Sequence, residues 1–366
     1  MKKIFARAIS AVLVTQTVLL ASSCGKEKDP SEYPVPELVG TTINVFNWGE
    51  NISDGSDDSL DINAEFEEKY GITVNYTNYD SNEIMYTKLK SGAVSYDIII
   101  PSDYMIERLI NEDMLKKIDM SKIPNYKNID DKYKNMYFDP NNEYSVPYTV
   151  GMVGLIYNKT MVKEKPDSWS VMWDEKYKDN ILTFNNPRDS FAIAQLLLGQ
   201  DLNSTDKADW NAAKDKLLEQ NKVLQGRVMD EVYNKMEGEN AAIAPYYAGD
   251  FLTMKENNDD LEFVYPKEGV NIFVDSMCVP SSCQNYEAAL LYINFMLEPE
   301  IGLANAEYIC YASPNTTVVN NEEYSLKDSE ILYPSEENMP KVQYFHDLDP
   351  EIRSYYESLW EEVVRG

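Results

Sequence analysis

Three polar residues, Ser102, Asp103 and Tyr104, follow the apolar run Ile98–Ile100, which stops at a proline. A continuous β-branched run of this kind is typical of a strand covered on both faces, as parallel strands between helices are. Proline cannot extend the strand ladder, and Met105–Leu115 has the pattern of an amphipathic helix. The polar residues are therefore predicted at the carboxyl end of a strand, where open α/β sheets bind ligands. The alternative is an ordinary loop in which Asp103 caps the helix.

A carboxylate at position 189 follows a second strand-like run in the same way. Residues 181–184 have strand character, Asn186 is a typical helix N-cap and Pro187 suits the first helical position. Asp189 then lies in the first turn of the helix, near the carboxyl end of the strand. The alternative is that Asp189 only stabilises the helix dipole, an effect of about 0.3–1 kcal/mol.

Asp275 is unusual because it interrupts an apolar stretch, residues 272–279, that we predict to be a strand. Burying an unpaired carboxylate costs several kcal/mol, so this side chain needs a cation. The cation is either a bound ligand or a lysine or arginine of the protein, and the sequence leaves both possibilities open.

The residue types that most enzymes need are scarce. His346 is the only histidine, which excludes a multi-histidine zinc site, and there is no phosphate-binding loop. Beyond the N-terminal segment, three cysteines remain, Cys278, Cys283 and Cys310, without CxxC spacing, and whether two of them pair is open. The acidic stretch 54–61 lacks the spacing of a calcium loop. We expect no enzymatic activity, no metal site and no cofactor.

Strands and helices are predicted to alternate along residues 41–104. The strand-like runs are 43–47, 72–77 and 96–100, and the helical patterns between them are 59–70 and 81–89. Gly71 and Gly92 follow the two helical patterns, and Ser81 suits an N-cap. This alternation predicts right-handed crossovers and an open, largely parallel sheet. The first strand ends at Trp48, which we expect on the same rim as Tyr104.

The length of 366 residues indicates two domains rather than one. A second alternation begins after residue 148. Its predicted strands are 153–157, 181–184, 241–245 and 272–279, and the predicted C-terminal helices are 286–297, 299–308 and 350–364.

The first 24 residues have the features of a bacterial export signal. Basic residues precede the apolar run 9–21, and the following Ser-Ser-Cys24 resembles a lipobox, in which the cysteine receives a diacylglyceryl group and becomes the mature N-terminus. We therefore predict a lipoprotein signal peptide at 1–23, lipidation of Cys24 and a polar, proline-containing tether at 24–40. The alternative is secretion without a lipid.

The net charge of −29 argues against a nucleic-acid partner, since phosphates would be repelled. The same charge raises the local concentration of cations near any cleft. The 27 tyrosines suit surfaces that bind small amphipathic ligands.

Several stretches taken together resemble the spermidine/putrescine-binding subunits of bacterial ABC importers. In chain order they are FNWGE (46–50), YDSNEIMYTKLKSG (79–92), YDIIIPSDY (96–104), FDPNNEYSVPY (138–148), YPKEG (265–269), VDSMCVP (274–280), YASPN (311–315) and LYPSEE (332–337). Each stretch is weak by itself, but their order and spacing are specific. The resemblance covers residues 41–366.

This resemblance implies an α/β, two-lobed periplasmic-binding-protein-like fold of type II. Each lobe would be a mainly parallel sheet flanked by helices, with the ligand in the cleft between lobes. Lobe 1 is expected at 41–148 plus 276–320, and lobe 2 at 149–275 plus 321–366. The implied function is capture of a polyamine and its delivery to an ABC permease by hinge closure. We expect a monomer, lipid-anchored on the periplasmic side or outer face of the membrane.

The resemblance also implies the binding residues. Trp48 would stack on the polyamine, and Asp275 and Asp189 would pair with ammonium groups. The other expected contacts are Glu50, Asn51, Ser102, Tyr104, Asn186, Tyr247, Phe273, Tyr311 and Phe345. Five positions depart from the family pattern: Tyr247 and Phe273 replace frequent tryptophans, Asn186 an acidic residue, Asn51 a tyrosine and Phe345 a glutamine. These departures leave the choice between putrescine and spermidine open.

A polyamine is a string of ammonium groups separated by methylene runs, so it needs carboxylates and aromatic faces in alternation. Aromatic faces cover methylenes and attract cations by about 0.5–2 kcal/mol each. The alternatives are a binding protein for another small cation or a sugar, and a secreted hydrolase. Two separated carboxylates in the cleft would favour a polyamine. A hydrolase would need an acid and a base about 5–10 Å apart flanking the scissile bond.

Overall fold

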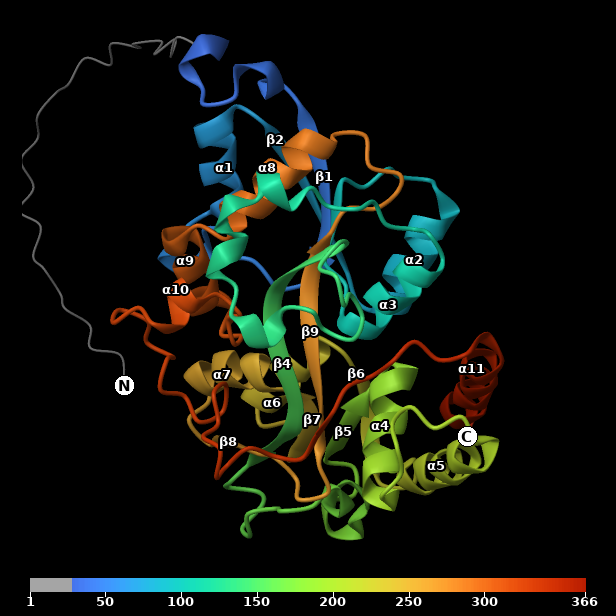
Figure 1. Ribbon diagram of the computed structural model, residues 1–366. Helices are drawn as coiled ribbons and strands as arrows, with labels where there is room; N and C mark the ends of the chain where they lie inside the picture. Colours follow the sequence, from blue (N-terminus) through green and yellow to red (C-terminus); the bar gives the residue numbers. More distant parts are fainter. Residues whose placement is uncertain (1–27) are drawn as a thin grey trace, which may run out of the picture.

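Two long strands, β4 (Ser145–Asn158) and β9 (Val270–Cys278), run antiparallel along the length of the molecule and connect its two lobes (Figure 1). The computed structural model describes residues 28–366. Every residue of β4 and of β9 is buried, which explains their near-continuous apolar sequence. Their register shifts between Pro147 and Thr149, which leaves Tyr148 as an extra residue opposite Asp275 and Ser276.

The first lobe contains three parallel strands beside β9, in the order β2-β1-β3-β9-β4. These strands are β1 (Thr42–Trp48), β2 (Thr73–Tyr79) and β3 (Ile98–Ile99). The helices of this lobe are α1 (Ile62–Tyr70), α2 (Asn82–Ser91), α3 (Asp103–Asn111), α8 (Tyr286–Met296), α9 (Pro299–Ile309) and α10 (Thr316–Val319). Ile99 of β3 pairs antiparallel with Cys278, so the late strand β9 completes a sheet that the N-terminal strands begin.

The second lobe continues the path of strands from β4 through β7, β5 and β6, with β8 also paired to β4. The strands are β5 (Ile181–Phe184), β6 (Leu224–Val228), β7 (Ile243–Tyr247) and β8 (Leu261–Val264), and β10 (Val342–Gln343) pairs parallel to the start of β9. The helices are α4 (Pro187–Leu198), α5 (Lys207–Gln220), α6 (Glu231–Glu237), α7 (Ala248–Asn257) and α11 (Pro350–Arg365). Short 3₁₀ helices occur at Ser56–Asp58, Met120–Lys122, Pro124–Asn128, Asp131–Tyr133, Trp169–Trp173 and Glu175–Tyr177.

The predicted type II two-lobed α/β fold is confirmed, and so are its local signals. Ser81 accepts a hydrogen bond from the backbone N–H of Ile84, as an N-cap should, and Gly71, Gly92 and Gly199 end their helices with positive φ. The three outer strands of the first lobe, β2, β1 and β3, are parallel to one another, and so are β7, β5 and β6 in the second lobe. By contrast, β9 is antiparallel to β3 and β4, and β4 is antiparallel to β7. The antiparallel strands arise because the chain passes from one lobe to the other and back, a long-range event that local periodicity does not encode.

The start of α3 differs from the prediction. The helix begins at Asp103 rather than Met105 and ends at Asn111, and the N-cap position is held by Ser102. The carboxylate of Asp103 is fully buried and accepts the backbone N–H groups of Tyr104 (2.7 Å) and Val274 (3.2 Å). Asp103 therefore fastens α3 to β9 and does not act as a simple helix cap.

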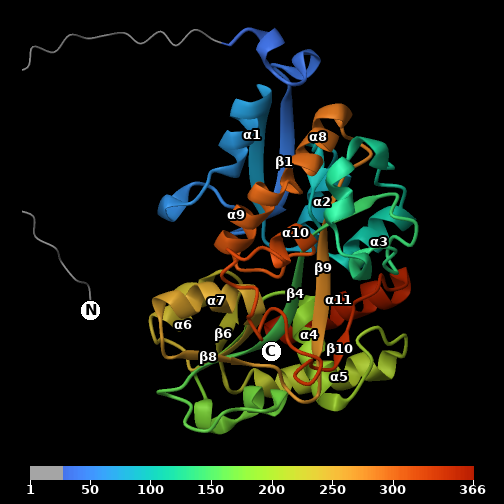
Figure 2. The same cartoon turned by 60° about the vertical axis from the view of Figure 1, so that its left-hand side comes forward.

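The segment before β1, which the sequence analysis assigned to a tether, lies on the first lobe where it is described. Residues Pro30–Glu32 and Pro36–Leu38 form two 3₁₀ helices, and Val35 and Leu38 pack against the apolar core of this lobe. Figure 2 shows this segment at the end of the first lobe farthest from the second lobe. Cys24 and the predicted signal peptide lie outside the described residues. Within residues 28–366, no helix is long and apolar enough to span a membrane.

Candidate functional site

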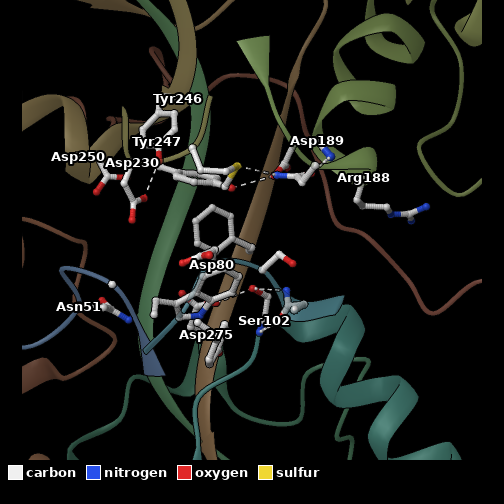
Figure 3. Close-up of a pocket in the computed structure, with 18 of the residues that line it drawn as sticks. Asn51, Asp80, Ser102, Arg188, Asp189, Asp230, Tyr246, Tyr247, Asp250 and Asp275 are labelled. Carbon is white, nitrogen blue, oxygen red and sulfur yellow. Dashed lines mark hydrogen bonds between the residues drawn. The ribbon is translucent and has the colours of Figure 1, made fainter. Parts of the chain in front are cut away.

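A cavity opens between the lobes where the carboxyl ends of several strands meet (Figure 3). It holds about 90 Å³ of space for water-sized groups. All of the residues predicted to contact ligand line it: Trp48, Glu50, Asn51, Ser102, Tyr104, Asn186, Asp189, Tyr247, Phe273, Asp275, Tyr311 and Phe345. The structure thus brings the whole predicted set together, and the strand ends supply both walls, as open α/β sheets predict.

Asp275 lies at the crossing between the lobes and is only 4% exposed. Its Oδ1 accepts a hydrogen bond from Ser102 Oγ (2.7 Å), and its Oδ2 accepts one from Thr149 Oγ1 (3.1 Å). Within residues 28–366, no lysine, arginine or histidine nitrogen forms a salt bridge with it. The internal salt bridge left open by the sequence is therefore not formed in this part of the chain. Burial raises the pKa of Asp275 to about 7, although both hydrogen bonds act to lower it.

Ser102 is itself held by a network of side chains from α2 and α3. Asn82 Nδ2 donates to Ser102 Oγ and to the hydroxyl of Tyr104, each at 3.2 Å. The Tyr104 hydroxyl donates to Glu83 Oε1 (2.9 Å). The hydroxyl that faces Asp275 therefore has a fixed position before any ligand arrives.

Asp189 forms a second carboxylate position on the wall made by lobe 2. Its Oδ2 accepts hydrogen bonds from Asn186 Nδ2 and from the Tyr247 hydroxyl, both at 2.8 Å. Burial raises the pKa of this carboxyl group. Asp189 does lie in the first turn of α4, as the helix-dipole alternative requires, but its side chain also faces the cavity. Its neighbour Arg188 points away from the group in Figure 3 and donates to Asn203 Oδ1 (2.9 Å).

A third carboxylate position, centred on Asp250, was missed by the sequence analysis. Asp250 accepts hydrogen bonds from the hydroxyls of Tyr233 (2.6 Å) and Tyr311 (2.8 Å), and burial raises its pKa to about 6. Figure 3 shows Asp230 beside it, across the cavity from Asp189.

A sequence signal for this third position does exist. Asp250 follows β7, Asp230 follows β6 and Asp80 follows β2, so all three stand at strand carboxyl ends like the residues that were predicted. Applying that rule to every strand, and not only to those near a recognised motif, would have found them.

The cavity lining is strongly anionic. Among the described residues that form it, seven are carboxylates, namely Glu50, Asp80, Glu83, Asp189, Asp230, Asp250 and Asp275, and Arg188 is the one cation. Burial and the neighbouring charge of Asp230 raise the pKa of Glu50. Such a lining repels anions and attracts a ligand with more than one positive charge.

Aromatic rings line the cavity between the carboxylates. Trp48 is fixed by a hydrogen bond from its Nε1 to the Ile100 carbonyl (2.9 Å), and its ring packs on Tyr79 with centroids 4.7 Å apart. Phe273 and Tyr247 meet edge to face at 5.4 Å.

Two further lining residues have contacts of their own. Phe345 meets Tyr104 edge to face at 5.8 Å. The Asn51 amide donates to Asn47 Oδ1 (3.3 Å), and the Asn51 carbonyl accepts from the Tyr148 hydroxyl (2.7 Å). Asn51 therefore lines the cavity while it also holds the loop after β1.

Catalytic and metal-binding groups are sparse in the part of the chain that the structure describes. No group of three or more histidine, cysteine, aspartate or glutamate side chains there is arranged to hold a metal ion. Cys278, Cys283 and Cys310 are free and buried. His346 lies outside the cavity lining, with its Nδ1 3.5 Å from Glu107 Oε2.

The family model of bacterial extracellular solute-binding proteins matches residues 61–331. The sequence is 32% identical over 330 residues to the spermidine/putrescine-binding periplasmic protein of Salmonella typhimurium, which covers 89% of this chain and 92% of that protein. A solved Listeria monocytogenes structure is 36% identical, with a TM-score of 0.84 over 88% of this chain and 98% of that one. The spermidine/putrescine ABC transporter substrate-binding protein of Streptococcus pneumoniae is also 36% identical, with a TM-score of 0.74 over 89% and 99%.

The raised pKa of Asp275 predicts a pH-dependent effect on folding when Asp275 is replaced by Asn. Between the ordinary value of 3.8 and about 7, the folded state holds a proton that the unfolded state has lost, so this group makes the wild type less stable as pH rises. Asp275→Asn removes this pH-dependent decrease in folding stability. In urea unfolding without ligand, we expect its stability relative to wild type to increase by roughly 2–3 kcal/mol between pH 5 and pH 7. A difference that does not change with pH would show that Asp275 is ionised in the folded state throughout.

Proposed function

The chain belongs to the bacterial extracellular solute-binding protein family, and on that premise we propose that it captures a polyamine between its lobes and delivers it to an ABC permease. The observation that carries the proposal is Asp275, a buried carboxylate at the lobe crossing with hydroxyl partners but no cation within residues 28–366. A carboxylate in that setting gains most from a ligand ammonium, because its charge is otherwise poorly compensated.

The arrangement of the other carboxylates suits more than one ammonium group. Asp189 lies on one side of the cavity and Asp250 with Asp230 on the other, while Asp275 lies between the lobes (Figure 3). The rings of Trp48 and Phe273 line the space that methylene runs would occupy. We propose these side chains, together with the rest of the predicted set, as the polyamine contacts.

The chemistry of the lining favours a polyamine over the alternatives. The cavity of about 90 Å³ is bounded by carboxylates and by aromatic rings, which suits a short chain of ammonium groups and methylene runs. A sugar has no charge to compensate the buried carboxylates. Against a hydrolase, Asp189, Asp250 and Asp275 each already accept two hydrogen bonds from hydroxyls or an amide, as groups that hold a bound cation would.

We propose that the lobes close about the crossing of β4 and β9, with boundaries at 148/149 and 275/276. The shift of register at Tyr148 supports this position, because a bulge interrupts the strand ladder there. Hydrogen bonds from Ser102 to Asp275 and from Tyr311 to Asp250 join groups on opposite sides of these boundaries. Closure would exclude water and so strengthen each charge pair with the ligand.

The choice between putrescine and spermidine stays open, since the chain has Asn186 and Tyr247 where the family often has an acidic residue and a tryptophan. We further propose that the protein acts as a monomer outside the cytoplasm and is attached to the membrane through a lipid on Cys24. The family's extracellular role supports the location. Two or more acyl chains would give stable attachment where one would not.

Replacing Asp275 by Asn should weaken polyamine affinity about a hundredfold, or about 2.7 kcal/mol. The substitution keeps the shape and removes the charge: one of the Ser102 and Thr149 hydroxyls can still donate to the amide oxygen, and the other can rotate to accept from the amide nitrogen. Calorimetry with putrescine and spermidine measures the change.

Asp139→Asn is a matched control because Asp139 is equally buried but lies outside the cavity lining. Its carboxylate accepts the backbone N–H groups of Glu143, Tyr144 and Ser145. Asp139→Asn should lower folding stability by about 1–3 kcal/mol and leave affinity unchanged. If Asp275→Asn behaves like this control, the binding role of Asp275 is wrong.

Charge rather than shape should decide which ligand binds. A neutral diol with the same chain length as putrescine cannot compensate the carboxylates, so its affinity should be lower by at least about a hundredfold. Polyamine affinity should also fall modestly as salt rises, because a closed cleft is screened less than a surface. Titration with both ligands at two ionic strengths checks this, and equal binding of the diol would contradict the electrostatic account.

Replacing Cys24 by Ala should remove the lipid attachment site. The variant is expected to appear in the medium or to remain unprocessed, because no thiol is left to carry the diacylglyceryl group. Fractionation of cells and medium, followed by mass determination, measures the outcome. Membrane retention and processing identical to wild type would contradict lipidation at this residue.

A further inference from the structure

The ring of Phe273 lies against Gly151, its partner on the neighbouring strand β4. A Cβ atom built on Gly151 would lie 2.2 Å from Cζ, 2.7 Å from Cε2 and 2.9 Å from Cε1 of that ring. Real Cβ atoms essentially never approach another heavy atom within 3.0 Å. The φ of Gly151 is not in the positive range, so its backbone would accept another residue. Glycine is needed at position 151 because the Phe273 ring occupies the space in which the side chain of any other residue at this position would lie.

Gly151 does not line the cavity, whereas Phe273 does. The ring therefore separates Gly151 from the ligand space, and any side chain at 151 must push the ring toward that space. Restoring ordinary contact at 3.4 Å from the present 2.2 Å requires a shift of at least about 1.2 Å. Because the Phe273 ring forms part of the wall of a cavity of about 90 Å³, a shift of this size would narrow the space beside it.

The position of this ring matters because of its neighbours along the cleft. Phe273 and Asp275 are two residues apart on β9, so their side chains project from the same face of the strand. On its other side, Phe273 meets Tyr247, whose hydroxyl donates to Asp189. The ring thus lies between two carboxylate positions, where the methylene run of a bridging ligand would pass.

We propose that Gly151 is a specificity-determining residue that acts without touching the ligand: by seating Phe273 deep against β4, it leaves room for the longer polyamines. This inference rests on the proposed polyamine-binding function. A short diamine can shift its position when the ring rises, but a triamine that fills the cavity cannot. A side chain at position 151 should therefore lower the affinity for spermidine more than the affinity for putrescine.

A second aromatic residue of the cavity lining, Tyr311, packs on a glycine in the same manner. A Cβ atom on Gly249 would lie 2.4 Å from Cδ2 of Tyr311, and Gly249 is likewise outside the cavity lining. This seat lets the Tyr311 hydroxyl reach Asp250 at 2.8 Å. An aromatic ring thus packs on a glycine in two walls of the cavity. Gly151 is the better test because the ring that packs on it belongs to Phe273, which has no hydroxyl, whereas Tyr311 donates to Asp250.

The chain supplies a matched control in Gly154, three residues farther along β4. A Cβ atom on Gly154 would lie 2.1 Å from Cζ of Phe263, so an alanine there creates the same kind of clash. Phe263 belongs to β8 and does not line the cavity. Gly154→Ala should therefore strain the same strand without changing the ligand space.

The experiment is calorimetric titration of the purified full-length protein with putrescine and with spermidine. Gly151→Ala should lower the ratio of spermidine to putrescine affinity about tenfold, the effect of a lost methylene-sized space. Gly154→Ala should leave the ratio within about twofold of wild type. Equal weakening of both ligands by Gly151→Ala, or the same change of ratio in both variants, would overturn the inference.

A second comparison covers the case in which Gly151→Ala fails to fold. In a Phe273→Leu background the smaller side chain relieves the clash, so adding Gly151→Ala should change the ratio by less than about twofold. A larger change would show that Gly151 acts by another route and would overturn the inference. If the wild type binds neither polyamine, the proposed function itself is wrong and the inference falls with it. A wild type that binds both, with a ratio indifferent to Gly151, contradicts the inference alone.

Discussion

The structure depends on a carboxylate that is costly to bury and is placed where two lobes meet. Asp275 stands in β9, a strand whose every residue is buried, and only two hydroxyl groups compensate its charge within the described chain. Hydroxyls stabilise a carboxylate without neutralising it, so burial still raises its pKa. The two lobes converge on this residue, and the surrounding cavity is anionic in nearly every direction. A cation with several charges is the ligand that such a lining favours over sugars, anions and neutral molecules.

The topology explains how residues far apart in the sequence come to surround that carboxylate. Parallel strands present their carboxyl ends at one edge, so Trp48, Ser102, Asp189 and Asp250 arrive at the cavity from β1, β3, β5 and β7. The loops carry the polar groups and the strands carry the apolar core. Changes in ligand preference can thus occur in the loops while the core stays intact. Gly151 and Gly249 are exceptions to this division, because they influence the cavity from positions within β4 and α7.

Much of this arrangement could be predicted from the sequence, because local signals determine it. The β-branched run before Ser102, the cap at Asn186 and the glycine after each early helix all act over a few residues. Recognition of family motifs then brought distant residues such as Tyr311 and Phe345 into the predicted site. The antiparallel path of β4 and β9 was not predictable in this manner, since it depends on the chain crossing between lobes. Asp103 was misjudged for the same reason: its second hydrogen-bond partner, Val274, is 171 residues away.

The pairing of β9 with both β3 and β4 has a consequence for how the protein assembles. The first lobe is discontinuous in sequence, so a nascent chain that has emerged only as far as β8 holds an incomplete N-terminal sheet with an open edge at β3. That sheet closes only once residues 270–278 are available, and contacts of such long sequence separation form slowly. The first lobe therefore cannot complete its sheet until about three quarters of the chain has been made, and its final strand forms contacts with both of its neighbours at once.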